Sequence, residues 1–430
     1  MMKTRLAKWV LSLLLIAATL PMLAQNRFPK PDFESGYQYP SETHIMPPGL
    51  AADLLDIAIL LGMLSVATWA VLKRRSRRWV IGISLVSVAW FGFIKEGCVC
   101  PVGSIQNVAL ALADPSYILP ISVWAYFFIP LFFALLFGRI FCSGVCPFGA
   151  LQDLVHVKNY PLSKAVSGFL GLLPWIYLGI SILFAITRTS FLICKFDPFV
   201  GFFRLGGPSN IMIFGGLLLV ASIFTGRPYC RFLCPYGALL KIFSKVSLTH
   251  AVITPKPCVS CALCMTACPS DAILYPQTNQ VAETRNEGVK RILLYFVLLP
   301  LMVLLGAWTF GQMAPSFAMS NKTVVMSEIL KQADPSEMEN SLEIQAFRSQ
   351  EGNEELLFAE AEQIRGTFYM GMLIVGGFIG MLFGTLLISL SLKRKRDTYL
   401  IDKGNCVSCA RCFSYCPLNL SSNDSKETPK

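Results

Sequence analysis

The feature that most constrains the fold of this chain is a series of apolar stretches, each long enough to cross a lipid bilayer. A spanning helix needs roughly 17–25 apolar residues, because the hydrocarbon core is about 30 Å thick. Seven stretches reach this length, near residues 51–72, 79–95, 118–138, 165–187, 209–225, 291–311 and 368–392. With 54% hydrophobic and only 15% charged residues, the chain is expected to be an all-α polytopic membrane protein.

Basic residues predict the orientation, because cytoplasmic loops of membrane proteins are enriched in Lys and Arg. Basic clusters at residues 73–78 and 393–396 follow the first and last spans, so both are expected on the cytoplasmic side. The C-terminus is then expected in the cytoplasm, and the acidic 312–367 loop is expected outside. The net charge of +11 follows from this topology, and we expect no nucleic-acid partner.

Eight of the 15 cysteines form two runs with the spacing Cys-x2-Cys-x2-Cys-x3-Cys-Pro. The runs are Cys258, Cys261, Cys264 and Cys268, and then Cys406, Cys409, Cys412 and Cys416. This is the spacing of bacterial ferredoxins, in which three close cysteines hold one cluster and the fourth reaches a second cluster. The sequence therefore predicts two [4Fe–4S] clusters.

Two predicted spans separate the runs and return the chain to the side from which it started. We therefore expect the two halves to meet as one small ferredoxin-like α+β iron–sulfur module on the cytoplasmic side. The expected ligand sets are Cys258, Cys261 and Cys264 with Cys416, and Cys406, Cys409 and Cys412 with Cys268. The alternative is that each run holds its own cluster or pairs across a dimer.

Two further cysteine pairs share the pattern Cys-x3-Cys-Pro-x-Gly-Ala-Leu. Cys142 and Cys146, and likewise Cys230 and Cys234, stand where a predicted span meets a basic loop. Each pair is one helical turn apart and shares a face if the helix continues through it. The proline after each pair suits the first turn of a new helix. Together the pairs supply four sulfur ligands for an iron–sulfur cluster or a tetrahedral metal; buried free thiols are the alternative.

Cys98, Cys100 and Cys194 are predicted on the outer side. Cys100 begins a third copy of the repeat, Cys-Pro-Val-Gly, while Cys194 lies in the segment 191–204, whose aromatic and basic residues are typical of an interfacial helix. An outer, oxidising compartment permits a disulfide or free thiols. The other interpretation is a second redox-metal site that includes a non-cysteine ligand.

Other cofactors and chemistries lack the residues that they require. The three histidines, His44, His156 and His250, all lie outside the apolar segments, which argues against a b-type haem with paired histidine ligands. No Cys-x-x-Cys-His motif for c-type haem occurs. No acid–base or nucleophile constellation stands out, so we expect an electron-transfer subunit rather than a stand-alone enzyme.

These observations divide the chain into eight expected parts. Basic residues before an apolar run make residues 1–24 resemble a signal peptide or an N-terminal anchor. The parts are 1–24; an extracytoplasmic segment, 25–50; a five-span membrane domain with Cys-Pro motifs, 51–250; the first ferredoxin half, 251–290; a transmembrane helix, 291–311; an acidic extracytoplasmic helical loop, 312–367; a transmembrane helix, 368–392; and the second ferredoxin half, 393–430. The acidic loop is either a solvated hairpin or a docking surface for a redox partner.

The motifs also resemble a known family. Phe141-Cys-x3-Cys-Pro-Phe-Gly-Ala-Leu-Gln and Tyr229-Cys-Arg-x-Leu-Cys-Pro-x-Gly-Ala, followed by a ferredoxin run, are similar to the membrane polyferredoxins of the NosR/NirI and NapH type. The resemblance covers roughly residues 118–270. It implies a membrane electron-transfer protein that serves a periplasmic reductase or its maturation. NosR-type proteins commonly carry a flavin-binding domain before the spans, whereas this chain has only a short segment there and no Ser-Gly-Ala-Thr motif.

The expected function is relay of electrons between a quinol or a cytoplasmic ferredoxin-like donor and a periplasmic flavin or haem redox protein. The cofactors would be the two [4Fe–4S] clusters and a further cluster or iron at the membrane cysteines. Quinone would be an additional cofactor if the donor is a quinol. The alternative is a copper-reducing assembly factor for a respiratory metalloenzyme, which shares the Cys-x3-Cys-Pro pattern. That alternative predicts copper at the outer cysteines or at Met313, Met319 and Met326.

Overall fold

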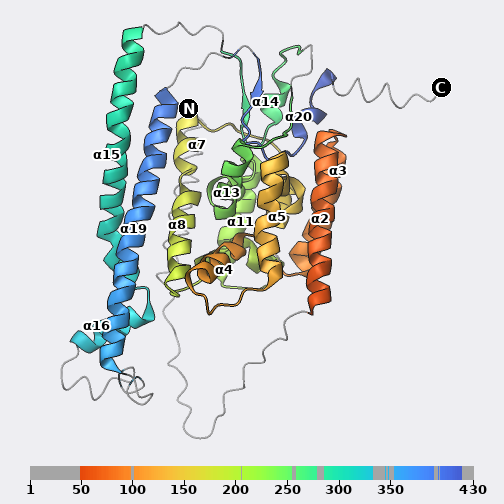
Figure 1. Ribbon diagram of the computed structural model, residues 1–430. Helices are drawn as coiled ribbons and strands as arrows, with labels where there is room; N and C mark the ends of the chain where they lie inside the picture. The colour runs from red at the N-terminus through yellow and green to blue at the C-terminus, as the bar shows by residue number, and fades with distance from the viewer. Residues whose placement is uncertain are drawn as a thin grey trace.

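The computed structural model describes residues 49–97, 101–204, 206–253, 258–277, 285–332, 344, 347, 353–391, 396 and 398–418. The predicted leader, nearly all of the segment 25–50, and Cys98 and Cys100 lie outside these residues, as does most of the stretch 333–352. The described chain is a helical bundle that carries a small two-stranded module at one end (Figure 1).

The first half of the bundle contains eight α-helices and two π-helical segments. In chain order they are α2 (Leu50–Leu72), α3 (Arg77–Ser87), η2 (Val88–Ile94), α4 (Pro101–Ala113), α5 (Ile121–Phe137), η3 (Phe141–Val145), α6 (Pro147–Val155), α7 (Lys164–Leu170), α8 (Leu173–Ile186) and α9 (Leu192–Phe196). The remaining elements are α10 (Pro198–Phe203), α11 (Ser209–Phe224), α12 (Pro228–Phe232), α13 (Pro235–Lys245), α14 (Leu263–Ala267), β1 (Ile273–Leu274), α15 (Arg285–Ala318), α16 (Lys322–Gln332), α19 (Glu354–Ser391), β2 (Leu400–Ile401) and α20 (Arg411–Ser414).

Five described helices are long and apolar enough to cross a membrane: Ala51–Leu72, Arg77–Ile94, Lys164–Ile186, Val289–Ala318 and Glu354–Ser391. They correspond to five of the seven predicted spans. The other two predicted spans form α5 and α11, which are apolar but have only 17 and 16 residues. At 1.5 Å per residue such helices are about 24–26 Å long, a little less than the hydrocarbon core. The number of seven crossings therefore remains a prediction.

The chain does not continue as one helix through the first cysteine pair, so the condition under which the sequence placed both cysteines on one helical face is not met. Helix α5 ends at Gly138, whose φ of 79° lies in the left-handed region that glycine adopts without strain. The π-helical turn Phe141–Val145 follows, and Pro147 then begins α6. Short π-helical segments are frequent at functional sites. This break turns the two cysteines of the pair into the bundle.

The last two long helices, α15 and α19, pack along each other as a hairpin (Figure 1). Helix α19 runs unbroken from Glu354 to Ser391, so the boundary predicted between the acidic loop and the last span, at residue 368, lies inside a helix. Glycines allow the close packing. A Cβ atom on Gly376 would lie 2.3 Å from the carbonyl oxygen of Gly306, and one on Gly380 only 2.1 Å from that of Met302.

We expect Gly380→Ile to destabilise this hairpin, because the added atoms overlap the backbone of α15. Overpacking of this kind costs about 1–3 kcal/mol. The measurement is the Tm of the detergent-solubilised protein. Gly366→Ile in the same helix is the matched control, since nothing lies within 4 Å of a Cβ atom there. An equal fall in Tm for both variants would contradict the close packing.

The two-stranded module joins segments that are far apart in the sequence. Strand β1 pairs antiparallel with β2, with Ile273 opposite Ile401 and Leu274 opposite Leu400, and α14 packs against α20. The segments on the two sides of the α15–α19 hairpin thus form one body at one end of the bundle, and α4 and α16 lie at the other end (Figure 1).

The two cysteine loops of the module have the same backbone conformation. Both read Cys-Val-Ser-Cys-Ala, and their serine and alanine residues have left-handed φ angles, 52° and 59° at Ser260 and Ala262 and 51° and 60° at Ser408 and Ala410. Each alanine precedes a short helix that carries the third cysteine of its run. The repeat in sequence is therefore also a repeat in local structure.

Candidate metal centres

The eight cysteines of the ferredoxin runs line two small cavities. One cavity is lined by Cys258, Cys261, Cys264 and Cys416. The other is lined by Cys268, Cys406, Cys409 and Cys412. The structure therefore brings together the two crossed sets expected from the sequence, and not the four cysteines of each run.

The donor sets of the two cavities fit iron–sulfur clusters, and Cys268 and Cys409 are buried whereas Cys258 and Cys261 are exposed. A [4Fe–4S] cluster takes four thiolates, one on each iron, which surround the cluster rather than meet at one point. No three His, Cys, Asp or Glu side chains among the described residues converge tightly enough to hold a single metal ion. Burial raises the pKa of the Cys406 thiol to about 12 and also raises that of Cys268. Metal binding would deprotonate such thiols.

The four membrane-domain cysteines are all buried, with 5–8% of their surface exposed. Cys142 lies in η3 and Cys230 in α12, whereas Cys146 and Cys234 are the residues just before α6 and α13. Cys146 has φ −75° and ψ 118°, and Cys234 has φ −68° and ψ 113°. The two repeats thus place their second cysteine in the same extended conformation before a proline.

The glycine of each Cys-Pro-x-Gly sequence lies against the first cysteine of a pair. A Cβ atom on Gly149 would lie 2.9 Å from the carbonyl oxygen of Cys142 and 3.7 Å from the Sγ atom of Cys230. A Cβ atom on Gly237 would lie 3.0 Å from the carbonyl oxygen of Cys230. Gly149 therefore contacts the first cysteine of both pairs, so the two pairs face each other in the bundle.

Hydrogen-bond donors surround these sulfur atoms. The Nε2 amide of Gln152 lies 3.4 Å from the Sγ atom of Cys230, and the backbone N–H of Gly237 lies 3.3 Å from that of Cys234. Burial, followed by the nearby Cys142, raises the pKa of Cys230 to about 12. Four buried thiols supply enough sulfur ligands to hold a cluster. The hydrogen-bond donors directed at these sulfur atoms would tune the reduction potential of that cluster.

We expect Gly149→Ala to weaken metal binding at the membrane cysteines, because the added Cβ overlaps the Cys142 carbonyl and separates the two pairs. Forced overlap costs about 1–3 kcal/mol. The measurement is iron per chain after anaerobic purification, which should fall relative to the parent protein. Gly62→Ala is the control, since nothing lies within 4 Å of its Cβ position. Unchanged iron in Gly149→Ala would contradict this role of the glycine.

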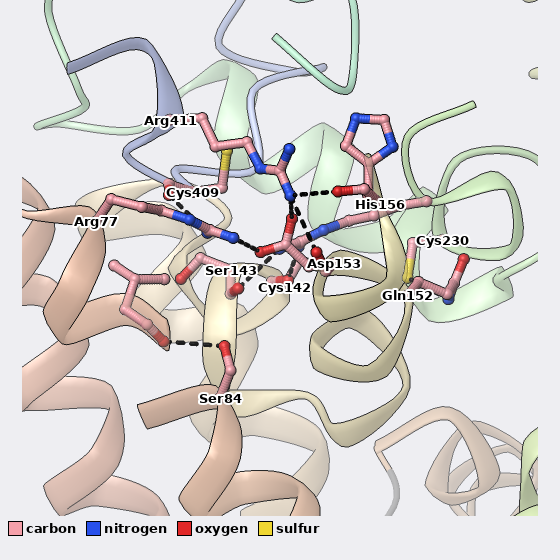
Figure 2. A network of polar contacts seen from close by, with 12 residues as sticks. Arg77, Ser84, Cys142, Ser143, Gln152, Asp153, His156, Cys230, Cys409 and Arg411 are labelled. Atoms are coloured by element: carbon pink, nitrogen blue, oxygen red, sulfur yellow. Dashed lines mark hydrogen bonds and ion pairs between the residues drawn. The ribbon is translucent and has the colours of Figure 1, made fainter. Parts of the chain in front are cut away.

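A buried ion network lies between the membrane cysteines and the ferredoxin module (Figure 2). At its centre is Asp153, which is 2% exposed. Its carboxylate lies 3.0 Å from Arg227 Nη2 and 3.4 Å from Arg411 Nη2, and it also accepts a hydrogen bond from Arg77. Burial alone would raise the pKa of Asp153, but the three guanidinium groups, Arg227 foremost, lower it below the usual value. Asp153 is therefore ionised.

The arginines of this network also bind backbone carbonyl groups at both metal centres. Arg77 donates to the carbonyl oxygen of Cys409 at 3.0 Å, within the second ferredoxin run. Arg227 donates to the carbonyl oxygens of Cys142 and, at 2.8 Å, Ser143. One carboxylate thus connects the polypeptide around a membrane cysteine with that around a ferredoxin cysteine (Figure 2).

Two elements of the site were missed in the sequence. The first is the pair Arg139 and Arg227, each of which follows a glycine and stands three residues before the first cysteine of its pair. The repeat therefore begins with Gly-Arg-x-x, before Cys142 and Cys230. The recurrence of Gly-Arg was the signal that could have revealed these residues. The second is Asp153, a lone acid in Ala-Leu-Gln-Asp, whose arginine partners come from distant parts of the chain.

The segment 191–204 differs from the interfacial helix that was predicted. It forms the short helices α9 and α10, and Phe199 and Phe203 are only 0% and 3% exposed. Between the helices stands Asp197, with φ −71° and ψ 114°, followed by a proline. This is the conformation of Cys146 and Cys234. The sequence Asp-Pro-Phe-Val-Gly resembles Cys-Pro-x-Gly but has one more residue before the glycine, and this similarity was overlooked.

Of the three cysteines assigned to the outer side, only Cys194 belongs to the described residues. It is exposed on α9, and its Sγ atom lies 3.4 Å from the Cβ position of Gly103, in the copy of the repeat that begins at Cys100. At the membrane site, the Sγ atom of Cys230 lies at a similar distance, 3.7 Å, from the Cβ position of Gly149. Tyr229, the neighbour of Cys230, donates a hydrogen bond to Asp197 at 3.2 Å. The segment around Cys194 is therefore connected directly to the four-cysteine site.

Comparison with known proteins gives an independent view of these motifs. A 4Fe-4S binding domain family matches residues 119–164 and 207–250, the two regions that contain the membrane cysteine pairs. No solved structure matches the chain.

Several curated relatives share the same region. The regulatory protein NosR of Pseudomonas aeruginosa is 29% identical over 223 residues, which are 47% of this chain and 30% of NosR. Protein NirI of Paracoccus denitrificans is 30% identical over 52% of this chain and 35% of its own length. The ferredoxin-type protein NapH of Escherichia coli is 28% identical over 48% of this chain and 76% of NapH. This chain thus matches about a third of NosR and of NirI. In its cysteine motifs, its buried cysteine sites and its relatives, the chain is similar to the membrane polyferredoxins of the NosR, NirI and NapH type.

Proposed function

We propose that this protein relays electrons across a bacterial inner membrane, between its ferredoxin module and a redox partner on the opposite side. A membrane iron–sulfur electron-transfer role is supported by the family and by its ferredoxin-type relatives. The observation that carries the proposal is the continuity of three cysteine centres. The cavity that contains Cys409 adjoins the buried four-cysteine site through one ion network. It shares the lining residue Ile253 with the other four-cysteine cavity.

The ligands that we propose follow the cavities. Cys258, Cys261, Cys264 and Cys416 would hold one [4Fe–4S] cluster, and Cys268, Cys406, Cys409 and Cys412 a second. Cys142, Cys146, Cys230 and Cys234 would hold a third cluster. Such clusters supply one-electron transfer. The chain binds them, excludes water with a core that includes the four membrane cysteines and Cys409, and directs N–H groups at their sulfur ligands.

The side of the membrane and the partners are part of the proposal. Positive loops favour a cytoplasmic ferredoxin module and C-terminus. The donor would be a quinol or a cytoplasmic ferredoxin-like carrier, and the acceptor a periplasmic flavin or haem protein. No catalytic constellation stands out in the sequence, so substrate chemistry would belong to such a partner. Cys194, with Cys98 and Cys100 outside the described residues, would serve electron exchange on the far side. Asp197 is the carboxylate nearest in sequence to Cys194.

Anaerobic iron and sulfide analysis combined with EPR spectroscopy tests this function. The proposal predicts three cluster signals, of which Cys146→Ala removes one and leaves the two that depend on the ferredoxin runs. Cys194→Ala is the matched control. It should retain all three signals, because Cys194 belongs to none of the three ligand sets. Iron confined to the two runs, with copper at the remaining cysteines, would instead support a metal-handling assembly factor.

A further inference from the structure

We propose that Arg139 and Arg227 are paired charge-compensating residues that set the reduction potential of the cluster at the four-cysteine membrane site. This inference rests on the proposed function, because it concerns the group that Cys142 and Cys230 would hold. It adds two positioning residues that touch the environment of the cluster without being its ligands.

The two arginines occupy equivalent places in the repeat and are buried. Each follows a glycine and stands three residues before the first cysteine of its pair. Arg139 is 5% exposed and Arg227 is 2% exposed. A guanidinium group stays charged in any protein environment, so both positions hold a permanent buried positive charge. Burying a charge costs free energy unless an opposite charge or hydrogen bonds compensate it.

Each arginine lies against the opposite repeat. Arg227 Nη1 is 3.7 Å from the Cβ position of Gly149, and Arg139 Nη2 is 3.3 Å from that of Gly237. Arg227 also donates to the carbonyl oxygen of Cys142. Because each arginine contacts the other repeat, the two guanidinium groups lie between the cysteine pairs and are related by approximate twofold symmetry.

Their contacts bring the positive charge to the sulfur ligands. Arg139 Nη2 lies 3.9 Å from the Sγ atom of Cys142. The Sγ atom of Cys230 and Arg227 Nη1 lie at the same distance, 3.7 Å, from the Cβ position of Gly149. Arg139 also donates to the carbonyl oxygen of Gly404, two residues before Cys406, so its position is fixed by the ferredoxin module as well.

Both arginines keep a hydrogen-bond donor without a protein acceptor. Among the described residues, the buried Nε atoms of Arg139 and Arg227 have no hydrogen-bond partner. A buried donor left unsatisfied costs free energy, and in native structures it calls for an explanation such as an ion or cofactor. Two such donors at equivalent positions of a repeat, next to four thiols, point to one anionic acceptor between the repeats. A cluster with four thiolate ligands is such an anion.

The direction of the effect follows from charge. Reduction adds one electron to an already anionic group in a low-dielectric site, and a nearby positive charge stabilises the reduced form more than the oxidised form. Removal of one guanidinium charge must therefore lower the reduction potential. We expect Arg139→Gln to lower the reduction equilibrium constant at least tenfold, which is about 59 mV for one electron.

The test is an EPR-monitored redox titration of the signal that Cys146→Ala abolishes, carried out on the full-length protein. Arg139→Gln should shift its midpoint downwards, and Arg139→Lys, which keeps the charge, should shift it by less than half as much. The double variant Arg231→Gln/Asp271→Asn is the matched control. It removes a neighbouring arginine together with the carboxylate that pairs with it at 2.8 Å, so the net charge is kept and the midpoint should not move.

The outcomes separate this inference from the proposed function. An unchanged midpoint in Arg139→Gln, with the signal intact, overturns the inference and leaves the membrane cluster in place. If glutamine abolishes the signal while lysine retains it, the need for a positive charge is supported. Loss of the signal in both variants, with the ferredoxin signals intact, indicates a purely structural role and contradicts the inference. If the parent protein has no signal sensitive to Cys146→Ala, the membrane cluster itself fails and the inference fails with it.

Discussion

Cys416→Ala is expected to abolish the cluster of the first ferredoxin run, although Cys416 belongs to the second. The reason is that Cys416 lines one cavity with Cys258, Cys261 and Cys264, so its thiolate completes their ligand set. The EPR spectrum of Cys416→Ala should therefore match that of Cys258→Ala. Conversely, Cys268→Ala should match Cys406→Ala, since these two cysteines line the other cavity.

Cys194→Ala is the control for this comparison, because Cys194 lies on α9, which neither cavity includes. Both ferredoxin signals should persist in that variant. If Cys416→Ala instead gave the spectrum of Cys406→Ala, each run would hold its own cluster, and the crossed assignment would be wrong.

Asp153→Asn is expected to destabilise the protein strongly and to loosen the ferredoxin module from the membrane domain. Three arginines surround Asp153, and its loss leaves buried positive charges without compensation. Breaking a buried ion pair by removing one partner costs about 3–5 kcal/mol. The readouts are the Tm in detergent and the rate of limited proteolysis near residue 404, which should rise.

The matched control is Asp114→Asn, which breaks an ion pair with Arg188, whose side chain is 65% exposed. Exposed ion pairs contribute little to stability, so the Tm should barely change. Because the pKa of Asp153 is lowered in the folded protein, its stabilising contribution is present above the usual carboxyl pKa of 3.8 and is lost only as the pH falls through the lowered value. A Tm for Asp153→Asn close to that of the control would show that the network does not hold the module.

The sequence was most informative where spacing alone specifies geometry. The Cys-x2-Cys-x2-Cys-x3-Cys-Pro runs predicted crossed sets, and the same sets line the two cavities. Hydropathy located all the long helices but did not reveal where they break. The left-handed conformation of Gly138 depends on local backbone geometry, which apolar content does not report.

The ion network and the conformation of Asp197 could not be inferred from spacing. Arg77, Asp153 and Arg411 are far apart in the chain, and only the packing of α3, α6 and α20 brings them together. Asp197 adopts the backbone of the repeat with an aspartate in place of a cysteine, so a search for cysteines passes over it. Arg139 and Arg227 gave a visible signal, the repeated Gly-Arg, whose meaning depends on the unsatisfied donors seen in the structure.

The central claim, that the buried four-cysteine site relays electrons between the ferredoxin module and the far side of the membrane, is tested most directly in lipid vesicles. The protein is reconstituted with a redox dye enclosed, and dithionite, which does not cross the bilayer, is added outside. The account predicts that the dye is reduced by the parent protein and that Cys230→Ala, which retains both ferredoxin signals, reduces it no faster than empty vesicles. Dye reduction by Cys230→Ala at the rate of the parent protein would contradict it.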